Sequence, residues 1–143
     1  MNDAGIPRAA LSATPSNLAA GLADVLVATL GALPDPVHVV DASGRVVWVN
    51  AAAVARSGYG AEALVGRHYA ALTRSPETGS AAMARLDAAI AARQAAVVPL
   101  VLRARDGTRL DFEARLIPLP PGPGATAAVA VQEIDVGERR RLV

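Results

Sequence analysis

Two runs of mostly β-branched residues, 37–40 and 46–49, constrain the fold more than any other feature of this sequence. Valine-rich runs of this length favour β-strands. Between them lie Asp41, whose carboxylate can accept hydrogen bonds from turn amides, and Gly44, which can adopt a positive φ. The sequence therefore predicts a β-hairpin. Because neither run alternates apolar with polar residues, we expect both faces of its sheet to be covered.

A second hairpin and a fifth strand are predicted in the last third of the chain. Residues 97–105 and 108–116 flank Asp106 and Gly107, a dipeptide that is strongly favoured in two-residue hairpin turns. Apolar and charged residues alternate along 108–116, which indicates a strand with one solvated face. A proline- and glycine-rich loop then leads to a final strand over 125–135.

Three helices are predicted between the two hairpins. Asn50 is expected to cap a short helix that runs to Arg56, and a second short helix over 61–65 ends at Gly66. After a polar loop, residues 80–94 have the apolar periodicity of a longer helix. The region therefore combines two brief helices with one longer helix.

The segment before the first hairpin predicts a further, amphipathic helix. Residues 16–33 place apolar side chains at spacings of three and four. This stripe either covers the sheet of its own chain or pairs with the same helix of a second copy. The predicted layout is a disordered N-terminus (1–15), this helix, one domain over 34–136, and the start of a C-terminal output helix or linker over 137–143.

These segments, in this order, resemble a PAS domain. Residues 34–52 resemble the opening of that family, in which an aspartate and a glycine turn the first hairpin and an asparagine starts the first helix. Residues 58–67 are similar to the next family segment, a glycine and an aromatic residue followed by a short helix that ends at glycine. The end of the chain resembles the family's Asp-Ile-Thr motif with its charged continuation. The residues that match the family's motifs are Asp41, Gly44, Asn50, Gly66, Asp106, Gly107 and Asp135.

The resemblance implies an α+β fold: a five-stranded antiparallel sheet with short helices and one longer helix on one face, preceded by the amphipathic helix. It also implies a signal-sensing and dimerisation module of a bacterial signal-transduction protein, such as a two-component system, rather than an enzyme. Gly137 replaces the motif's threonine, which in the family helps to hold the junction to an output helix, so the coupling there is expected to be weaker. Nothing in the sequence selects a kinase, a cyclase or a transcription factor as the effector.

Charge and composition argue against several other classes of function. The net charge is +1, from 14 Lys and Arg against 13 Asp and Glu, so no global field favours nucleic acid or an anionic membrane. No apolar run reaches the roughly 18 residues of a membrane span, and no signal peptide is evident, so we expect a cytoplasmic protein. No catalytic set stands out, because Asp111 and Glu113 alternate with arginines as a solvated ladder of charge.

Residues that could hold a chromophore are scarce. The chain has no cysteine, which excludes disulfides, thiolate metal sites and the flavin adduct of the family's light-sensing members. Haem-binding members carry an axial histidine on the longer helix, and residues 80–94 contain none. A non-covalent flavin stays open, with Trp48 and Tyr69 as ring partners, although aromatics make up only 3% of the chain. We therefore expect no cofactor and no metal.

Two sets of side chains are candidates for contacts with other molecules. The apolar face of helix 80–94 is either ordinary core or the wall of a pocket for a small apolar ligand. The pocket candidates are Tyr69, Leu72, Met83, Leu86, Ile90 and Phe112. The leading helix, with the sheet, is favoured as a homodimer contact, and its candidates are Leu18, Leu22, Val25, Leu26 and Thr29. His38, between valines on a strand, is interpreted as a hydrogen-bonded structural histidine.

Overall fold

The computed structural model describes residues 25, 28–73, 75, 77–120 and 126–136. The chain divides into two compact units, residues 1–33 and 34–143. In the first unit, the described residues 25 and 28–32 are helical, as the apolar spacing predicts. The Thr29 hydroxyl donates a hydrogen bond to the Val25 carbonyl at 2.8 Å, which is a contact within this helix. The predicted start of the helix, together with residues 1–15, lies outside the described residues.

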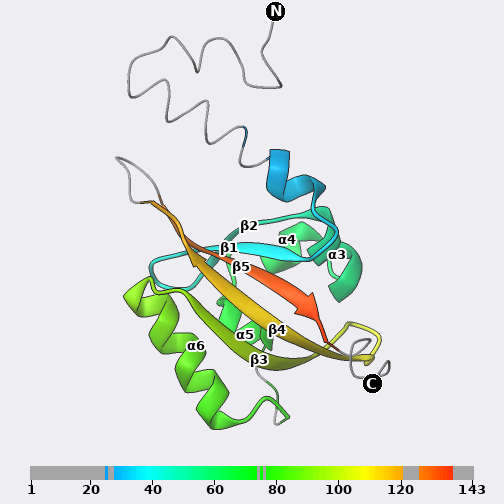
Figure 1. The fold of residues 1–143 in the computed structure, drawn as a ribbon. Coiled ribbons are helices and arrows are strands. Elements are labelled where there is room, and N and C mark those ends of the chain that lie inside the picture. The colour runs from blue at the N-terminus through cyan, green and yellow to red at the C-terminus, as the bar shows by residue number, and fades with distance from the viewer. Residues whose placement is uncertain (1–24, 26–27, 74, 76, 121–125, 137–143) are drawn as a thin grey trace, which may run out of the picture. The chain divides into compact units, whose positions relative to one another are not determined.

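The second unit is built on a five-stranded antiparallel sheet (Figure 1). Its strand order is β2-β1-β5-β4-β3, so the last strand in sequence lies at the centre of the sheet. Both predicted hairpins are present, and β5 joins them by pairing with β1 on one side and β4 on the other. The strands are β1 (Val37–Asp41), β2 (Val46–Val49), β3 (Ala96–Arg103), β4 (Arg109–Pro118) and β5 (Ala127–Asp135).

Four helices connect β2 to β3 and pack against one face of the sheet (Figure 1). The helix predicted over 80–94 is present as α6 and ends two residues earlier. One short helix, α5, begins at Tyr69 and was not predicted, because five residues are too few to show a helical period. The helices are α3 (Ala51–Ser57), α4 (Ala61–Leu64), α5 (Tyr69–Thr73) and α6 (Ser80–Ala92).

The core lies between the helices and this face of the sheet. Along β4, Phe112, Ala114 and Leu116 are buried and alternate with more exposed residues, as the sequence pattern predicts. Leu86 and Ile90 on α6 belong to the same buried cluster. The expectation that both faces of the sheet are covered holds for β1, whose first four residues are buried, but not for the whole sheet. Three apolar side chains remain substantially exposed on strands: Val47 at 36%, Val97 at 47% and Ile117 at 46%.

The first hairpin turn has the chemistry that its residues predict. The Asp41 carboxylate accepts hydrogen bonds from the Ser43 amide at 2.9 Å, the Arg45 amide at 3.0 Å and the Ser43 hydroxyl at 2.6 Å. The Ser43 hydroxyl contributes most to lowering the pKa of Asp41, and the Arg45 and Ser43 amides add to it. Gly44 adopts the expected positive φ of 90°.

The second hairpin turn is one residue longer than predicted. The Ala104 amide donates to the Thr108 carbonyl at 2.9 Å, so the loop contains three residues, 105–107, rather than two. A two-residue turn of the expected kind needs positive φ at both Asp106 and Gly107. Only Gly107 has it, at 91°, and a glycine in this conformation at the end of the loop is typical of three-residue hairpins.

Asn50 ties the start of α3 to the start of β1. Its side-chain oxygen accepts hydrogen bonds from the Ala53 amide at 3.0 Å and from the Val37 amide at 2.9 Å. Its side-chain nitrogen donates to the Asp35 carbonyl at 3.0 Å. Asn50 is only 2% exposed, so water cannot readily replace these partners. The predicted helix cap is therefore also a link between α3 and the sheet.

Replacing Asn50 with alanine should destabilise the protein by about 2–4 kcal/mol, the combined cost of losing a helix cap and of leaving a buried amide without a partner. Asn50→Asp should also be destabilising, because it keeps the oxygen that both amides need but places a second carboxylate oxygen opposite the Asp35 carbonyl. Urea unfolding at pH 7 measures both losses. If Asn50→Ala unfolds within about 0.5 kcal/mol of the wild type, a value typical of neutral surface substitutions, then Asn50 is not a structural link.

Candidate ligand-binding site

A cavity of about 140 Å³ is lined by residues of the sheet and of α3, α4 and α5. His38 on β1 and Glu133 on β5 line it from the sheet, and Leu102 and Arg103 line it from β3. The residues that line it from the helices include Ala53, Arg56 and Ser57 of α3, Leu64 of α4, and Tyr69, Leu72 and Thr73 of α5. The lining is therefore mixed, with charged and polar side chains beside aliphatic ones.

A carboxylate, a phenol and an imidazole meet on the sheet side of the cavity. The Tyr69 hydroxyl donates a hydrogen bond to Glu133 Oε2 at 2.6 Å. His38 Nδ1 lies 3.5 Å from the same oxygen, and the His38 and Tyr69 rings meet edge to face with centroids 5.1 Å apart. All three residues are buried, and Glu133 is only 2% exposed. Because a buried carboxylate is costly without donors, the Tyr69 hydroxyl is its main local support.

Strand pairing and one turn bring these three residues together. In the antiparallel register of β1 and β5, His38 lies opposite Val131, so Glu133 is two residues further along β5 on the same face. Tyr69 is held from the other side, because its amide donates to the Gly44 carbonyl at 2.9 Å. The first hairpin turn thus fixes the start of α5 and directs the phenol towards Glu133.

The environment of Tyr69 keeps its phenol protonated. Burial, the negative charge of Glu133 and the hydrogen bond to Glu133, in that order, raise the pKa of Tyr69 well above its ordinary value of 10.0. The hydroxyl therefore remains a hydrogen-bond donor at neutral pH. A neutral phenol beside a carboxylate can orient and stabilise that carboxylate, but it supplies no nucleophile and no base.

Two buried nitrogen atoms of residues that line the cavity have no hydrogen-bond partner, although one of them lies 3.5 Å from Glu133 Oε2. They are His38 Nδ1 and Arg56 Nη1, and they are the buried side-chain nitrogen and oxygen atoms that remain unpaired in the described part of the chain. Both residues line the same cavity. Buried polar groups in folded proteins are nearly always paired, so each exception calls for an explanation. The cavity thus offers polar groups to a bound molecule.

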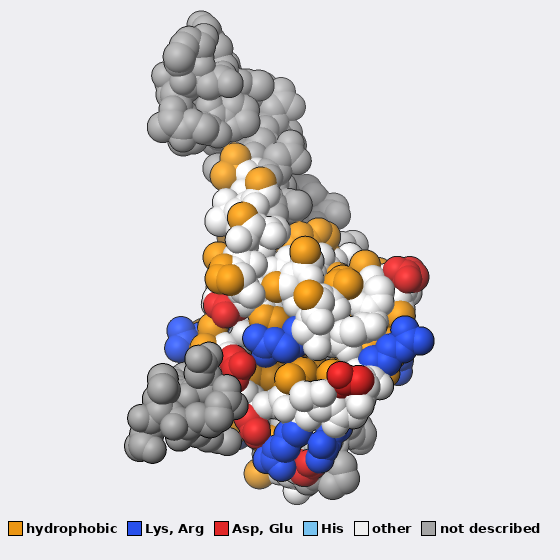
Figure 2. All heavy atoms as spheres, turned by 90° about the vertical axis from the view of Figure 1, so that its right-hand side faces the viewer, with side chains coloured by type: hydrophobic (Ala, Val, Ile, Leu, Met, Phe, Trp, Pro, Cys, Tyr) orange, Lys and Arg blue, Asp and Glu red, His pale blue; other side chains and the backbone are white. Residues whose placement is uncertain are grey.

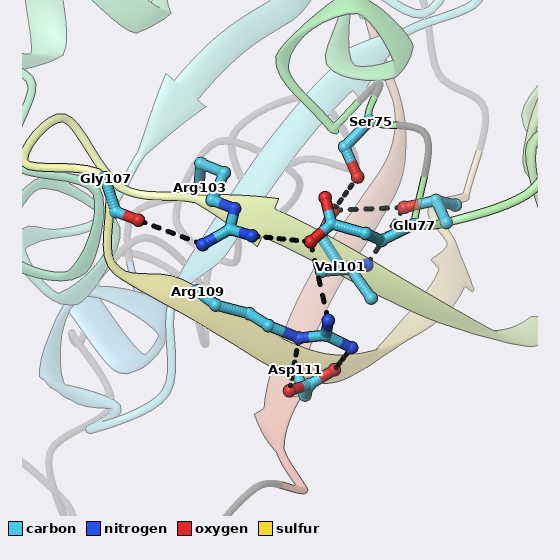
Figure 3. A network of polar contacts seen from close by, with 8 residues as sticks. Ser75, Glu77, Val101, Arg103, Gly107, Arg109 and Asp111 are labelled. Carbon is cyan, nitrogen blue, oxygen red and sulfur yellow. Dashed lines mark hydrogen bonds and ion pairs between the residues drawn. The ribbon is translucent and has the colours of Figure 1, made fainter.

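The β3 side of the cavity is held by a network of ion pairs (Figure 3). Arg103 donates to Glu77 Oε2 at 2.6 Å and to the Gly107 carbonyl at 3.2 Å. Glu77 also contacts Arg109 Nη1 at 3.4 Å, and Arg109 pairs with Asp111 at 3.1 Å. Although Arg103 lines the cavity, its guanidinium is engaged on both sides by groups of the protein.

Side chains of the loop before α6 also form hydrogen bonds with the outer backbone edge of β3. The Thr78 hydroxyl accepts a hydrogen bond from the Val101 amide and donates one to the Val101 carbonyl, both at 3.0 Å. The Ser75 hydroxyl donates to the same carbonyl at 3.0 Å (Figure 3). Because β3 is an edge strand, these side chains occupy backbone groups that would otherwise be free to pair with another chain.

The pocket candidates named from the sequence divide between the cavity and the core. Tyr69 and Leu72 line the cavity. Leu86, Ile90 and Phe112 belong to the buried core cluster, and Met83 packs against it, so the inner face of α6 fills space next to the sheet. His38, Arg56 and Glu133 were not predicted as site residues. The sequence signal that could have identified Glu133 is the polar pair Gln132 and Glu133, which follows five apolar residues of the same strand.

The other residues named from the sequence lie at turns, at element ends and on the first helix. Of the dimer candidates, Leu18, Leu22 and Leu26 lie outside the described residues, while Val25 is half-buried and Thr29 exposed. Gly66 has a positive φ of 90° after α4, and Asp135 is the last residue of β5. His68 is exposed.

Metal binding and membrane insertion find no support in the described ranges. No group of three or more His, Asp or Glu side chains there could hold a metal ion. No helix in this part of the chain is long and apolar enough to cross a membrane. Figure 2 shows one side of the protein, on which arginine and acidic side chains are interspersed with hydrophobic ones. Where this side is described, neither sign of charge dominates.

Comparison with known proteins identifies the family. A family model described as PAS fold matches residues 30–141. The chain belongs to the PAS family. This membership confirms the five-stranded antiparallel fold with its short helices as that of a PAS domain, and it supports a sensory module rather than a catalytic one. No curated protein sequence matches the chain.

Solved structures similar to this PAS domain come from proteins with different outputs. An RNA-binding light-oxygen-voltage receptor is 23% identical with a TM-score of 0.72, and the match covers 98% of this chain but only 37% of the receptor. The light-oxygen-voltage domain of a blue-light activated histidine kinase from Erythrobacter litoralis is 23% identical, with a TM-score of 0.64 and coverage of 73% and 98%. The PAS domain of the fruit-fly ELK potassium channel is 9% identical, with a TM-score of 0.70 and coverage of 80% and 96%. At these identities the likeness concerns the fold.

A flavin does not fit the residues that this PAS domain presents. The cavity of about 140 Å³ is close in size to cavities that hold benzene, whereas pockets for larger ligands measure about 300–1,000 Å³. Of the two suggested ring partners, Tyr69 is already engaged by Glu133 and His38. Trp48 on β2 lies opposite Val39 on β1, and it does not line the cavity. The chain also has no cysteine for an adduct.

Replacing Tyr69 with phenylalanine should change how stability depends on pH. Since the folded protein raises the pKa of Tyr69 above 10.0, the stabilisation from its neutral phenol is complete below pH 10 and is lost as the pH rises further. Wild-type stability should therefore fall more steeply above pH 10 than that of Tyr69→Phe. At pH 7 the variant should be less stable by about 1–3 kcal/mol, because Glu133 loses a donor.

Urea unfolding at pH 7, 10 and 11 measures both effects. Tyr59→Phe is the matched control, because Tyr59 is 38% exposed and is the only other tyrosine of the chain. The control should resemble the wild type at all three pH values. Equal slopes for Tyr69→Phe and wild type above pH 10 would contradict the role of the buried phenol.

Proposed function

We propose that this PAS domain is the signal-sensing and dimerisation module of a cytoplasmic signal-transduction protein, and that its signal is a small ligand bound in the cavity. The observation that carries the proposal is that two buried nitrogen atoms without a hydrogen-bond partner among the described residues, His38 Nδ1 and Arg56 Nη1, belong to residues that line the same cavity. A domain whose cavity served only for packing would be expected to fill it with apolar side chains or to pair its polar groups.

The proposed route from the cavity to the output runs along β5. Glu133 lines the cavity, and its amide donates to the Pro36 carbonyl at 2.9 Å. Two residues later the strand ends at Asp135, and the Val136 amide donates to the Asp111 carbonyl at 3.1 Å. A ligand that moves the Glu133 side chain would therefore act on the strand that leads to the residues after position 136. Such a shift requires that the ligand bind with different affinity to the protein before and after the Glu133 side chain moves.

The effector is left open by this proposal, as are the details of the pathway. The similar structures belong to an RNA-binding receptor, a histidine kinase and a potassium channel, so the shared fold selects none of these outputs. Within the proposal, the domain works without a flavin or haem, because its cavity is small, the chain lacks the cysteine of a flavin adduct, and residues 80–94 contain no histidine as an axial haem ligand. The catalytic step, where there is one, belongs to the effector.

Filling the cavity with a side chain should imitate a bound ligand and alter the end of β5. Ala53 is 1% exposed and lines the cavity, so Ala53→Leu introduces three carbon atoms there. We expect hydrogen exchange at the amides of residues 134–136 to change by about threefold or more, which corresponds to a shift of roughly 0.6 kcal/mol in local opening. Two-dimensional NMR measures these amides individually.

Two further variants make this experiment decisive. Leu72→Phe fills the same cavity from α5 and should produce a similar change, which separates occupancy from a local effect on α3. Ala84→Leu adds the same side chain on the exposed side of α6 and should leave residues 134–136 unchanged. If both cavity variants are folded and neither alters exchange at the end of β5, the proposed coupling is wrong.

Dimerisation through the N-terminal helix and the sheet is the second element of the proposal. Val97 and Ile117 leave an apolar area on the sheet, and the sequence of the leading helix carries an apolar stripe. Light scattering should show a dimer for the full chain and a monomer for the double substitution Leu22→Asp with Val25→Asp. Arg93→Gln, at the end of α6, should remain dimeric. A wild-type protein that is monomeric at all concentrations would refute this element alone.

A further inference from the structure

The chemistry of the cavity indicates what kind of ligand it would bind. Arg56 comes from the last turn of α3 and Arg67 from the segment between α4 and α5. Arg103, the third arginine of the lining, is engaged by Glu77 and the Gly107 carbonyl. Neither Arg56, which is partly buried, nor Arg67, which is exposed, forms an ion pair with a described residue.

Arg56 is the more informative of the two. Its Nη1 is buried and has no hydrogen-bond partner in the described part of the chain. A guanidinium stays charged at all physiological pH values and cannot relieve its burial by losing a proton. The group that suits it best is an anion with two coplanar oxygen atoms, because a carboxylate can pair with the planar guanidinium through two parallel hydrogen bonds.

The acidic residue of the lining does not cancel this preference. Glu133 lies on β5, whereas Arg56 and Arg67 come from the helix side of the cavity. The Glu133 carboxylate already receives the Tyr69 hydroxyl at 2.6 Å and faces His38 Nδ1 at 3.5 Å. An anion held by Arg56 would thus bind on the helix side of the cavity, and Glu133 on the sheet is the one acidic residue among the described residues of the lining.

The size and walls of the cavity define the rest of the ligand. Its volume of about 140 Å³ suits a molecule close to benzene in size. Leu64, Leu72 and Leu102 line it with aliphatic groups, which favour an apolar body over a second charged group. A free inorganic anion would leave these walls without contacts.

We infer that the cavity binds a small carboxylate with a short apolar body, whose carboxylate group pairs with the guanidinium of Arg56. The inference rests on the proposed function of the cavity as a ligand site and names the chemical class of that ligand. It differs from the sequence-based expectation of a purely aliphatic ligand on helix 80–94, because the cavity lies against α3–α5 and carries an unpaired cation.

Benzoate and benzamide test the inference, since they match in size and shape and differ in charge. In calorimetric titrations of the full chain at pH 7.5 and low ionic strength, benzoate should bind at least about tenfold more tightly than benzamide, a difference equivalent to 1.4 kcal/mol. Arg56→Gln should remove this preference by weakening benzoate and leaving benzamide nearly unchanged. Arg56→Lys should restore part of it, because the charge returns without the planar fork.

Controls locate the site and separate the sources of failure. Arg115→Gln alters an exposed arginine of β4 outside the cavity and should bind both probes like the wild type. Ala53→Leu should abolish binding by filling the space. Equal affinity for the two probes, an unchanged benzoate affinity in Arg56→Gln, or no binding of either probe at about 10 mM would overturn the inference.

Inorganic phosphate distinguishes a carboxylate with an apolar body from a small anion in general. Phosphate that binds more tightly than benzoate, and does so through Arg56, would also overturn the inference. These outcomes do not decide the sensory role itself. That role stands or falls with hydrogen exchange at the end of β5 in the cavity-filling variants.

Discussion

A carboxylate inside a protein must find hydrogen-bond donors, and Glu133 on the central strand imposes that requirement on this fold. The Tyr69 hydroxyl meets it at 2.6 Å, which ties α5 to β5. The Tyr69 amide in turn donates to the Gly44 carbonyl, so the same residue ties α5 to the first hairpin. One buried acid thus links the two halves of the sheet to a short helix that local preference alone would not specify.

Hydrogen bonds hold the elements around the cavity that Glu133 lines, while two polar atoms of the lining residues have no hydrogen-bond partner in the described part of the chain. Asn50 joins α3 to β1, and Thr78 and Glu77 hold the β3 side through Val101 and Arg103. Within this fixed frame, His38 Nδ1 and Arg56 Nη1 have no hydrogen-bond partner, and Arg56 forms no ion pair with a described residue. A binding site works best when its supporting groups are fixed in advance, because less freedom is then lost when the ligand binds.

Membership of the PAS family settles the architecture and leaves the ligand to be argued from the site. The similar structures share the fold at 9–23% identity and serve an RNA-binding receptor, a kinase and a channel. Function on a widely used fold resides in particular side chains. The small cavity and the Arg56 guanidinium are the grounds on which we propose a small carboxylate instead of a flavin, and these grounds lie in the residues of this domain rather than in the fold.

The sequence by itself determined the elements whose signals are local. Valine-rich runs, the Asp41 and Gly44 turn, the Asn50 cap and the alternation along β4 each depend on neighbours within a few residues, and together they specify two hairpins, the cap of α3 and the longer helix α6. Of the six pocket candidates that the sequence suggests, Tyr69 and Leu72 line the cavity and the other four lie in or against the core. What only the tertiary structure decided was where the cavity lies and which polar groups share it. Tyr69 and Glu133 are 64 residues apart in sequence, and Arg56 reaches the same space from a third element. Their meeting depends on the register of β5 between β1 and β4, a long-range pairing that no local pattern encodes.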